Sequence, residues 1–231
     1  MIFKLLWPEI CPFCGKVKWN GVCPACEKQL NKLAISQPYC MKCGKPVRRN
    51  EQEYCADCAE SKHFFDRGRA LWLHKPPVST SIYQFKYHNQ RVFGNYYAET
   101  MAKQFERVVC EWKPDLIIPV PLHPKRKRKR GYNQSQIIAE RLGKKWGIPV
   151  NGTILRRVKN TNPQKKLDHR TRKKNLQNAF AVKGNLYGIR NVILIDDIYT
   201  TGNTINEAAK KLKETGVEIV CFLTVSIGQG Y

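Results

Sequence analysis

The stretch 192–204 constrains the fold of this chain more than any other feature. It begins with four branched apolar residues, 192–195, and such an unbroken run is typical of a strand buried on both faces of a parallel sheet. Two acids follow, and a small polar loop then leads into the helix-like segment 205–215. This order predicts an α/β fold in which ligands bind at the carboxyl ends of the strands.

The loop 200–204 has the residue types of a phosphate site. Hydroxyl side chains and backbone N–H groups at the positive end of a helix can hold a phosphate. Carboxylates repel a phosphate, so Asp196 and Asp197 need another target, and the two hydroxyls of a ribose provide one. The stretch therefore indicates a ribose-5-phosphate site, with an ordinary strand–helix turn as the alternative. The predicted phosphate-binding residues are Thr200, Thr201, Gly202, Asn203 and Thr204.

This order of strand, paired acids, Thr-Thr-Gly-x-Thr and helix resembles the signature of type I phosphoribosyltransferases. The resemblance implies a parallel sheet flanked by helices, together with binding of 5-phosphoribosyl-1-diphosphate (PRPP). Phosphoribosyl transfer separates the ribose from a diphosphate, which is usually stabilised by Mg²⁺ held largely by substrate oxygens and water. We therefore expect magnesium to accompany PRPP.

A second loop suits the diphosphate. The apolar strand 115–120 ends in Pro-Val-Pro-Leu-His-Pro, in which three prolines within six residues fix the backbone. A basic run follows, and then a helix over 133–146. His123 either donates to the diphosphate or caps its own backbone, and both options stay open. The predicted residues of this loop are Val120, Pro121, Leu122 and His123.

Eight of the ten cysteines form four C-x-x-C pairs near the amino end. Each such turn directs two thiolates at one metal, and two turns complete a tetrahedral zinc shell. Sequential pairing is the simplest assignment, an interleaved cross-brace is the alternative, and iron is harder to exclude from the ligands alone. Cys110 and Cys221 lie in apolar settings and are expected in the core. The predicted zinc ligands are Cys11, Cys14, Cys23 and Cys26 for one ion, and Cys40, Cys43, Cys55 and Cys58 for the other.

The net charge is +23, because 41 lysines and arginines stand against 18 acids. Such an excess predicts binding of DNA, RNA or an acidic membrane surface, although a solvated basic face is the plainer alternative. Trp19, Tyr54 and Tyr132 are aromatic candidates for stacking on unpaired bases. The candidate DNA contacts are Lys125, Arg126, Lys127, Arg128, Lys129, Arg130, Tyr132, Lys165, Lys166, Arg170, Arg172, Lys173 and Lys174.

The length of 231 residues suits one α/β domain plus a small module. We assign residues 1–62 to a double zinc-ribbon module and residues 63–231 to the phosphoribosyltransferase-like domain. Helices are expected over 76–87 and 92–111, and a basic flap over 159–175. The chain has no apolar run long enough to cross a bilayer and no signal-peptide cleavage pattern at its start, so we expect a cytoplasmic protein.

Several motifs in one order resemble the ComF family of late competence proteins. They are the double zinc ribbon, the loop 119–124, Arg-Gly-Tyr-Asn-Gln at 130–134, Thr-x-Pro-Gln at 161–164 and the loop 196–202. The resemblance implies action on incoming single-stranded DNA during natural transformation. It also implies work beside a DNA-translocating ATPase, with recruitment to the inner face of the membrane.

Three functional hypotheses follow. The first is a ComF-like protein that binds single-stranded DNA and PRPP. The second is an active Mg-dependent phosphoribosyltransferase with an unknown acceptor, because no residue pattern announces an acceptor pocket. The third is a zinc-ribbon adaptor that binds a protein partner.

Overall fold

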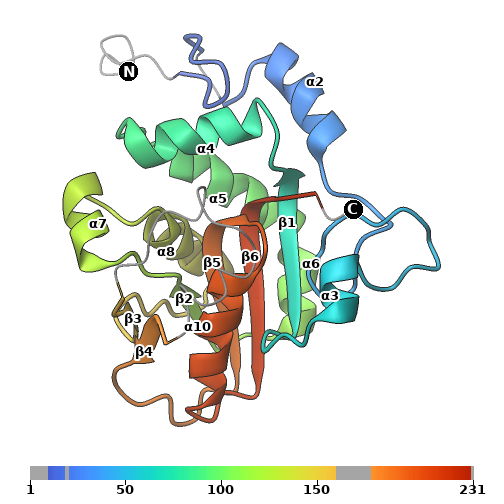
Figure 1. Ribbon diagram of the computed structural model, residues 1–231. Coiled ribbons are helices and arrows are strands. Elements are labelled where there is room, and N and C mark those ends of the chain that lie inside the picture. Colours follow the sequence, from blue (N-terminus) through green and yellow to red (C-terminus); the bar gives the residue numbers. More distant parts are fainter. Residues whose placement is uncertain (1–9, 19–20, 160–177, 230–231) are drawn as a thin grey trace.

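A four-stranded parallel sheet lies at the centre of the molecule (Figure 1), and the computed structural model describes residues 10–18, 21–159 and 178–229. The strand order is β1-β6-β5-β2, with every neighbouring pair parallel. The apolar run 192–195 in β5 is buried, which confirms the predicted central strand. The strands are β1 (Arg67–Leu73), β2 (Leu116–Pro119), β5 (Asn191–Tyr199) and β6 (Ile219–Ile227).

Strand β5 is longer than its apolar run. It continues through both acids to Tyr199, and its partner β6 continues beside it, with Asp196 opposite Thr224 and Tyr199 opposite Ile227. The acids are therefore the sixth and seventh of the nine residues of the strand and do not lie beyond its end. This still places them at the carboxyl edge of the sheet, next to the start of α10 (Asn203–Lys213).

One face of the sheet packs against three helices, α4 (Val78–Tyr87), α5 (Phe93–Gln104) and α8 (Gln134–Trp146). The predicted helix 92–111 is two helices, because α5 ends at Gln104 and α6 (Glu106–Trp112) begins after the single residue Phe105. Phe105 has a non-helical backbone but a buried ring. Phe105, Val109 and Trp112 continue the apolar side of α5 into α6, so periodicity alone did not reveal the break.

The other face of the sheet carries α10. Two short strands, β3 (Leu155–Arg157) and β4 (Phe180–Val182), form a separate antiparallel pair beside it. The basic run after the proline loop, for which no secondary structure was predicted, forms the helix α7 (Pro124–Arg130). Within the described ranges, no helix has the length and apolar character needed to span a membrane.

The two cysteine segments pack on opposite faces of the sheet, near the edge formed by β1 (Figure 1). The first segment includes α2 (Pro24–Leu33), and its Phe13 contacts the rings of Trp72 and Tyr97. The second includes α3 (Ala56–Glu60), and its cysteines share a core with Phe65 and Tyr199. Each cysteine segment therefore completes one of the two cores of the sheet.

Candidate functional site

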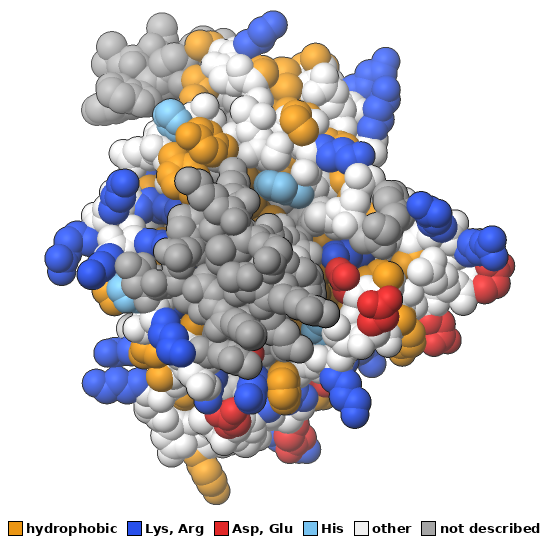
Figure 2. Space-filling model, viewed as in Figure 1, with side chains coloured by type: hydrophobic (Ala, Val, Ile, Leu, Met, Phe, Trp, Pro, Cys, Tyr) orange, Lys and Arg blue, Asp and Glu red, His pale blue; other side chains and the backbone are white. Residues whose placement is uncertain are grey.

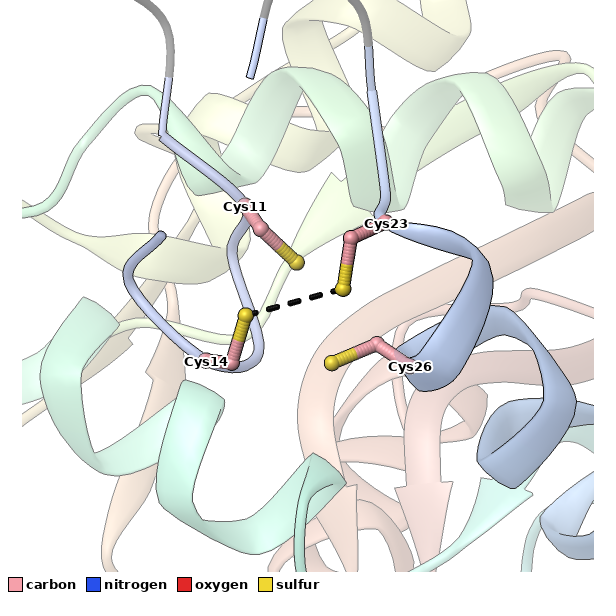
Figure 3. A group of neighbouring side chains, drawn as sticks. All are labelled: Cys11, Cys14, Cys23 and Cys26. Carbon is pink, nitrogen blue, oxygen red and sulfur yellow. Dashed lines mark hydrogen bonds between the residues drawn. The ribbon is translucent and has the colours of Figure 1, made fainter. Parts of the chain in front are cut away.

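The eight cysteines form two groups of four thiols, and within each group all the sulfur atoms lie within 4.8 Å of one another. Figure 3 shows the first group, in which Cys11 and Cys14 come from a loop and Cys23 and Cys26 from the start of α2. The Sγ atoms of Cys14 and Cys23 are 3.6 Å apart, as are those of Cys43 and Cys55 in the second group. A tetrahedron with Zn–S bonds of about 2.3 Å has edges of about 3.8 Å. Both groups therefore fit zinc.

The grouping follows the sequential pairing, so the cross-brace alternative is wrong. The first two cysteines of the second group, Cys40 and Cys43, lie on a tight turn, in which the N–H of Gly44 donates to the carbonyl of Cys40. Gly44 has φ +78°, and a Cβ there would come 2.7 Å from the carbonyl oxygen of Gly68, so glycine is required. Cys221 is buried as expected, whereas Cys110 is exposed on α6, which corrects its assignment to the core. Neither belongs to a four-thiol group.

The loop between β5 and α10 is shaped as an anion site. Gly202 precedes the helix with φ +75°, and a Cβ there would come 2.4 Å from the hydroxyl of Tyr199. Thr201 Oγ1 and Asn203 Nδ2 are buried, and neither has a hydrogen-bond partner among the described residues. The first turn of any helix also leaves backbone N–H groups without an acceptor in the helix. Buried polar atoms at such a helix end suit an anion.

The paired acids have different environments. Asp197 is buried, and its Oδ1 lies 2.7 Å from the ammonium nitrogen of Lys86 at the end of α4. Oδ1 of Asp196 accepts hydrogen bonds from Ser135 Oγ at 3.0 Å and from the N–H of Asp197 at 2.9 Å. Burial, and then the charge of Asp197, raises the pKa of Asp196 to about 7. One acid is therefore ion-paired, while the other can exchange a proton near neutral pH.

The proline loop lies beside this edge. The N–H of Val120 donates to the carbonyl of Ile195, and its own carbonyl accepts from Asn133 Nδ2. His123 caps α7, because its Nδ1 accepts from the N–H of Lys125 at 3.3 Å. Capping through Nδ1 selects the tautomer whose Nε2 carries the proton, so His123 keeps a donor as well. Desolvation and the charge of Lys125 lower the pKa of His123, which favours this neutral form.

Arg157 on β3 is a buried cation that the sequence analysis did not assign to the site. Burial, and then the charge of Arg126, lowers its pKa to about 10, while the charge of Asp196 acts in the opposite direction. Its guanidinium also lies 5.6 Å from the ring centroid of Phe180. A buried arginine within electrostatic range of Asp196 can supply a positive charge to an anionic ligand bound beside the paired acids.

Lys86 and Ser135 were also missed. Lys86 lies in an apolar helix pattern and meets Asp197 only through the tertiary fold, so no local signal marks it. Ser135 directly follows the motif at 130–134, and that position was the available signal.

The basic side chains of helix α7 are partly half-buried and partly exposed. Arg126 and Arg130 are half-buried, and Arg130 donates to Gln134 Oε1 at 2.5 Å. Figure 2 shows Lys and Arg side chains gathered over this helix, on the left of the view. The exposed members are Lys125, Lys127, Arg128 and Lys129. The candidate DNA contacts Lys165, Lys166, Arg170, Arg172, Lys173 and Lys174 lie outside the described residues, as does Trp19.

Tyr132 needs a correction. Its side chain is only 6% exposed, its hydroxyl donates to the carbonyl of Phe85, and the Arg91 guanidinium covers its ring at 4.6 Å. The ring is therefore part of the core and cannot stack on a base.

Comparisons with known proteins agree with this architecture. Residues 2–59 match the double zinc ribbon domain family, and residues 88–228 match the phosphoribosyl transferase domain family. Competence protein F of Haemophilus influenzae is 37% identical over 191 residues, covering 79% of this chain and 82% of that protein. The chain belongs to the competence protein F family.

Two further relatives of this family are more distant. The DNA utilization protein YhgH of Salmonella typhimurium is 29% identical, covering 78% of this chain and 80% of the relative. Competence protein ComFC of Bacillus subtilis is 28% identical, covering 79% of this chain and 74% of the relative. This member of the competence protein F family combines a phosphoribosyltransferase-like sheet with two four-cysteine zinc sites.

Proposed function

We propose that this protein binds PRPP with Mg²⁺, binds single-stranded DNA, and handles incoming DNA during natural transformation. The names of its relatives, competence protein F and DNA utilization protein, support the DNA half of this proposal. The phosphoribosyl transferase domain supports the PRPP half.

The observation that carries the PRPP half is the pair of buried polar atoms at the start of α10 that lack a partner among the described residues, Thr201 Oγ1 and Asn203 Nδ2. An unsatisfied buried polar atom costs about 1–3 kcal/mol, so its retention favours a ligand that satisfies it. The loop 200–204 would hold the 5-phosphate. Asp196 and Asp197, which lie in β5 shortly before this loop, would hold the ribose hydroxyls.

The diphosphate would lie toward the proline loop. Residues 120–123, with the Nε2 donor of His123, offer hydrogen bonds there, and Arg157 offers a buried positive charge. Mg²⁺ would be held mainly by oxygens of PRPP and by water, while the two acids orient that water. When bound, the metal neutralises negative charge on the diphosphate.

DNA would bind to the cationic surface of α7. Its four exposed lysines and arginines and the net charge of +23 favour a polyanion, and phosphate contacts make such binding sensitive to salt. We further propose a cytoplasmic location, a DNA-translocating ATPase as partner, and a division at residue 62 between the zinc module and the PRPP-binding domain.

Phosphoribosyl transfer is a second candidate, and the environment of Asp196 favours it. A carboxyl with a pKa of about 7 can take a proton from an acceptor nitrogen at neutral pH. Release of diphosphate from PRPP in the presence of an acceptor, lost in Asp196→Asn, would support this function.

Calorimetric titration tests the main proposal. The protein is titrated with PRPP and Mg²⁺, alone and in the presence of a single-stranded oligonucleotide, and each ligand should bind. If the two are coupled, each changes the affinity of the other by the same factor. Absence of PRPP binding would overturn the first half of the proposal, and absence of oligonucleotide binding the second.

A further inference from the structure

Helix α4 exposes a pair of aromatic rings on the side away from the core. Its buried residues include Val78, Ile82 and Phe85, which pack against the sheet. Tyr83 and Tyr87 lie about half a helical turn away from these residues and are 47% and 58% exposed. The core therefore does not account for the two rings.

The rings of Tyr83 and Tyr87 lie next to each other, and the ring of His88 lies near that of Tyr83. The ring centroids of Tyr83 and Tyr87 are 4.9 Å apart, as expected for residues four apart on a helix. The ring of His88, also exposed, lies 5.5 Å from that of Tyr83. We call Tyr83, Tyr87 and His88 the aromatic platform.

The platform adjoins the cationic helix. The guanidinium of Arg130, at the end of α7, lies 5.0 Å from the ring centroid of Tyr87. Neither residues 83–91 nor residues 124–130 contain an acid. The aromatic platform and the exposed cations of α7 therefore lie beside each other, and neither of these two segments contributes an acid.

This combination specifies a ligand. Phosphates pair with lysine and arginine, and unpaired bases stack on exposed rings, whereas the bases of a duplex already stack on one another. We propose that the aromatic platform stacks bases of a single DNA strand whose phosphates contact the exposed cations of α7. This inference rests on the proposed DNA-binding function and assigns it to a surface.

The aromatic platform lies on the same helix as a residue of the proposed PRPP site. Lys86 points inward from α4 and pairs with Asp197, while the adjacent Tyr87 points outward. DNA on the platform would therefore lie on the same helix end that supports the proposed PRPP site, without occupying it.

The test measures oligonucleotide affinity by fluorescence anisotropy at several salt concentrations. Tyr83→Ala combined with Tyr87→Ala should weaken binding by about 10-fold or more, because stacking contributes about 1–3 kcal/mol per base. The slope of log Kd against log salt should not change, because no phosphate contact is lost. Lys127→Gln combined with Lys129→Gln should reduce that slope.

Two controls make the test specific. Tyr187 is 93% exposed and precedes the amino end of β5, whereas the paired acids lie toward the carboxyl end of that strand. Tyr187→Ala should therefore leave oligonucleotide affinity unchanged. An abasic oligonucleotide should bind the wild-type protein and the double tyrosine variant equally. Circular dichroism melting verifies that each variant is folded.

The outcomes separate the two proposals. If the wild-type protein does not bind the oligonucleotide, DNA binding itself fails and the platform fails with it. If the wild-type protein binds and the double tyrosine variant binds equally well, the platform assignment is wrong while DNA binding stands. A loss of the same size for abasic DNA would show that the rings do not act through bases, which also overturns the assignment.

Discussion

The ammonium group of Lys86 lies 2.7 Å from Oδ1 of Asp197, and the two side chains are only 19% and 10% exposed. This ion pair joins the last turn of α4 to the carboxyl edge of β5. It neutralises one of two adjacent acids, so the site does not carry two unpaired charges before a ligand arrives.

Lys86→Met should lower the free energy of unfolding by about 2–4 kcal/mol, because it leaves a buried carboxylate without its partner. Combining it with Asp197→Asn should recover most of that loss, since both charges are then absent. Urea denaturation of the two single variants and the double variant measures the coupling. Additive effects would contradict a stabilising ion pair.

The raised pKa of Asp196 predicts a pH-dependent stability. Its pKa is about 7 in the folded protein and 3.8 without the fold, so the folded state retains the proton to higher pH. The stability that Asp196 contributes is complete below about pH 4 and is lost as the pH rises through 7.

Asp196→Asn should remove this dependence. Relative to the wild type, its stability should rise between about pH 4 and pH 7 and then level off, reaching a gain of up to about 4 kcal/mol. Denaturation curves at several pH values measure the difference. A constant difference across this range would contradict the assignment.

The unpartnered hydroxyl of Thr201 gives a prediction in which stability and binding move in opposite directions. Thr201→Val should not destabilise the ligand-free protein, and can raise its stability by about 1 kcal/mol, because it removes a buried polar atom without a partner among the described residues. It should weaken PRPP binding by about 10-fold or more.

Thr215→Val is the matched control, because the Thr215 hydroxyl donates to the carbonyl of Leu212 at 2.7 Å. It should lower stability and leave PRPP affinity unchanged. Thermal melting and calorimetry measure both properties. A Thr201 variant that loses stability but binds PRPP normally would assign this hydroxyl to the fold alone.

Zinc removal should affect the PRPP site as well as the cysteine segments. The second cysteine group shares its core with Tyr199, whose ring stacks on Phe222 at 4.7 Å and lies against Gly202 of the phosphate loop. Cys58→Ser should therefore lower both the melting temperature and PRPP affinity. Cys110→Ser, outside both groups, should change neither. Unaltered PRPP binding after loss of zinc would show that the loop is independent of the metal.

The parts of this structure that were predictable depend on local pattern. The unbroken apolar run predicted β5, and the C-x-x-C spacing identified the eight thiol ligands, because neighbouring residues alone produce both signals. How the four C-x-x-C turns combine into two groups depends on the tertiary fold. Lys86 and Arg157 reach the acids only after α4 and β3 pack beside β5, and no local pattern encodes that approach. Tyr132 follows a basic run like a surface residue, yet its ring is taken into the core.

An NMR titration of the isotope-labelled protein with ribose 5-phosphate tests directly whether the loop 200–204 binds a phosphate. The backbone amide signals of residues 201–204 should shift most and saturate together, and Thr201→Val should reduce the shifts at equal ligand concentration. A titration in which these signals stay in place, or in which the largest shifts lie away from the start of α10, would contradict phosphate binding by this loop.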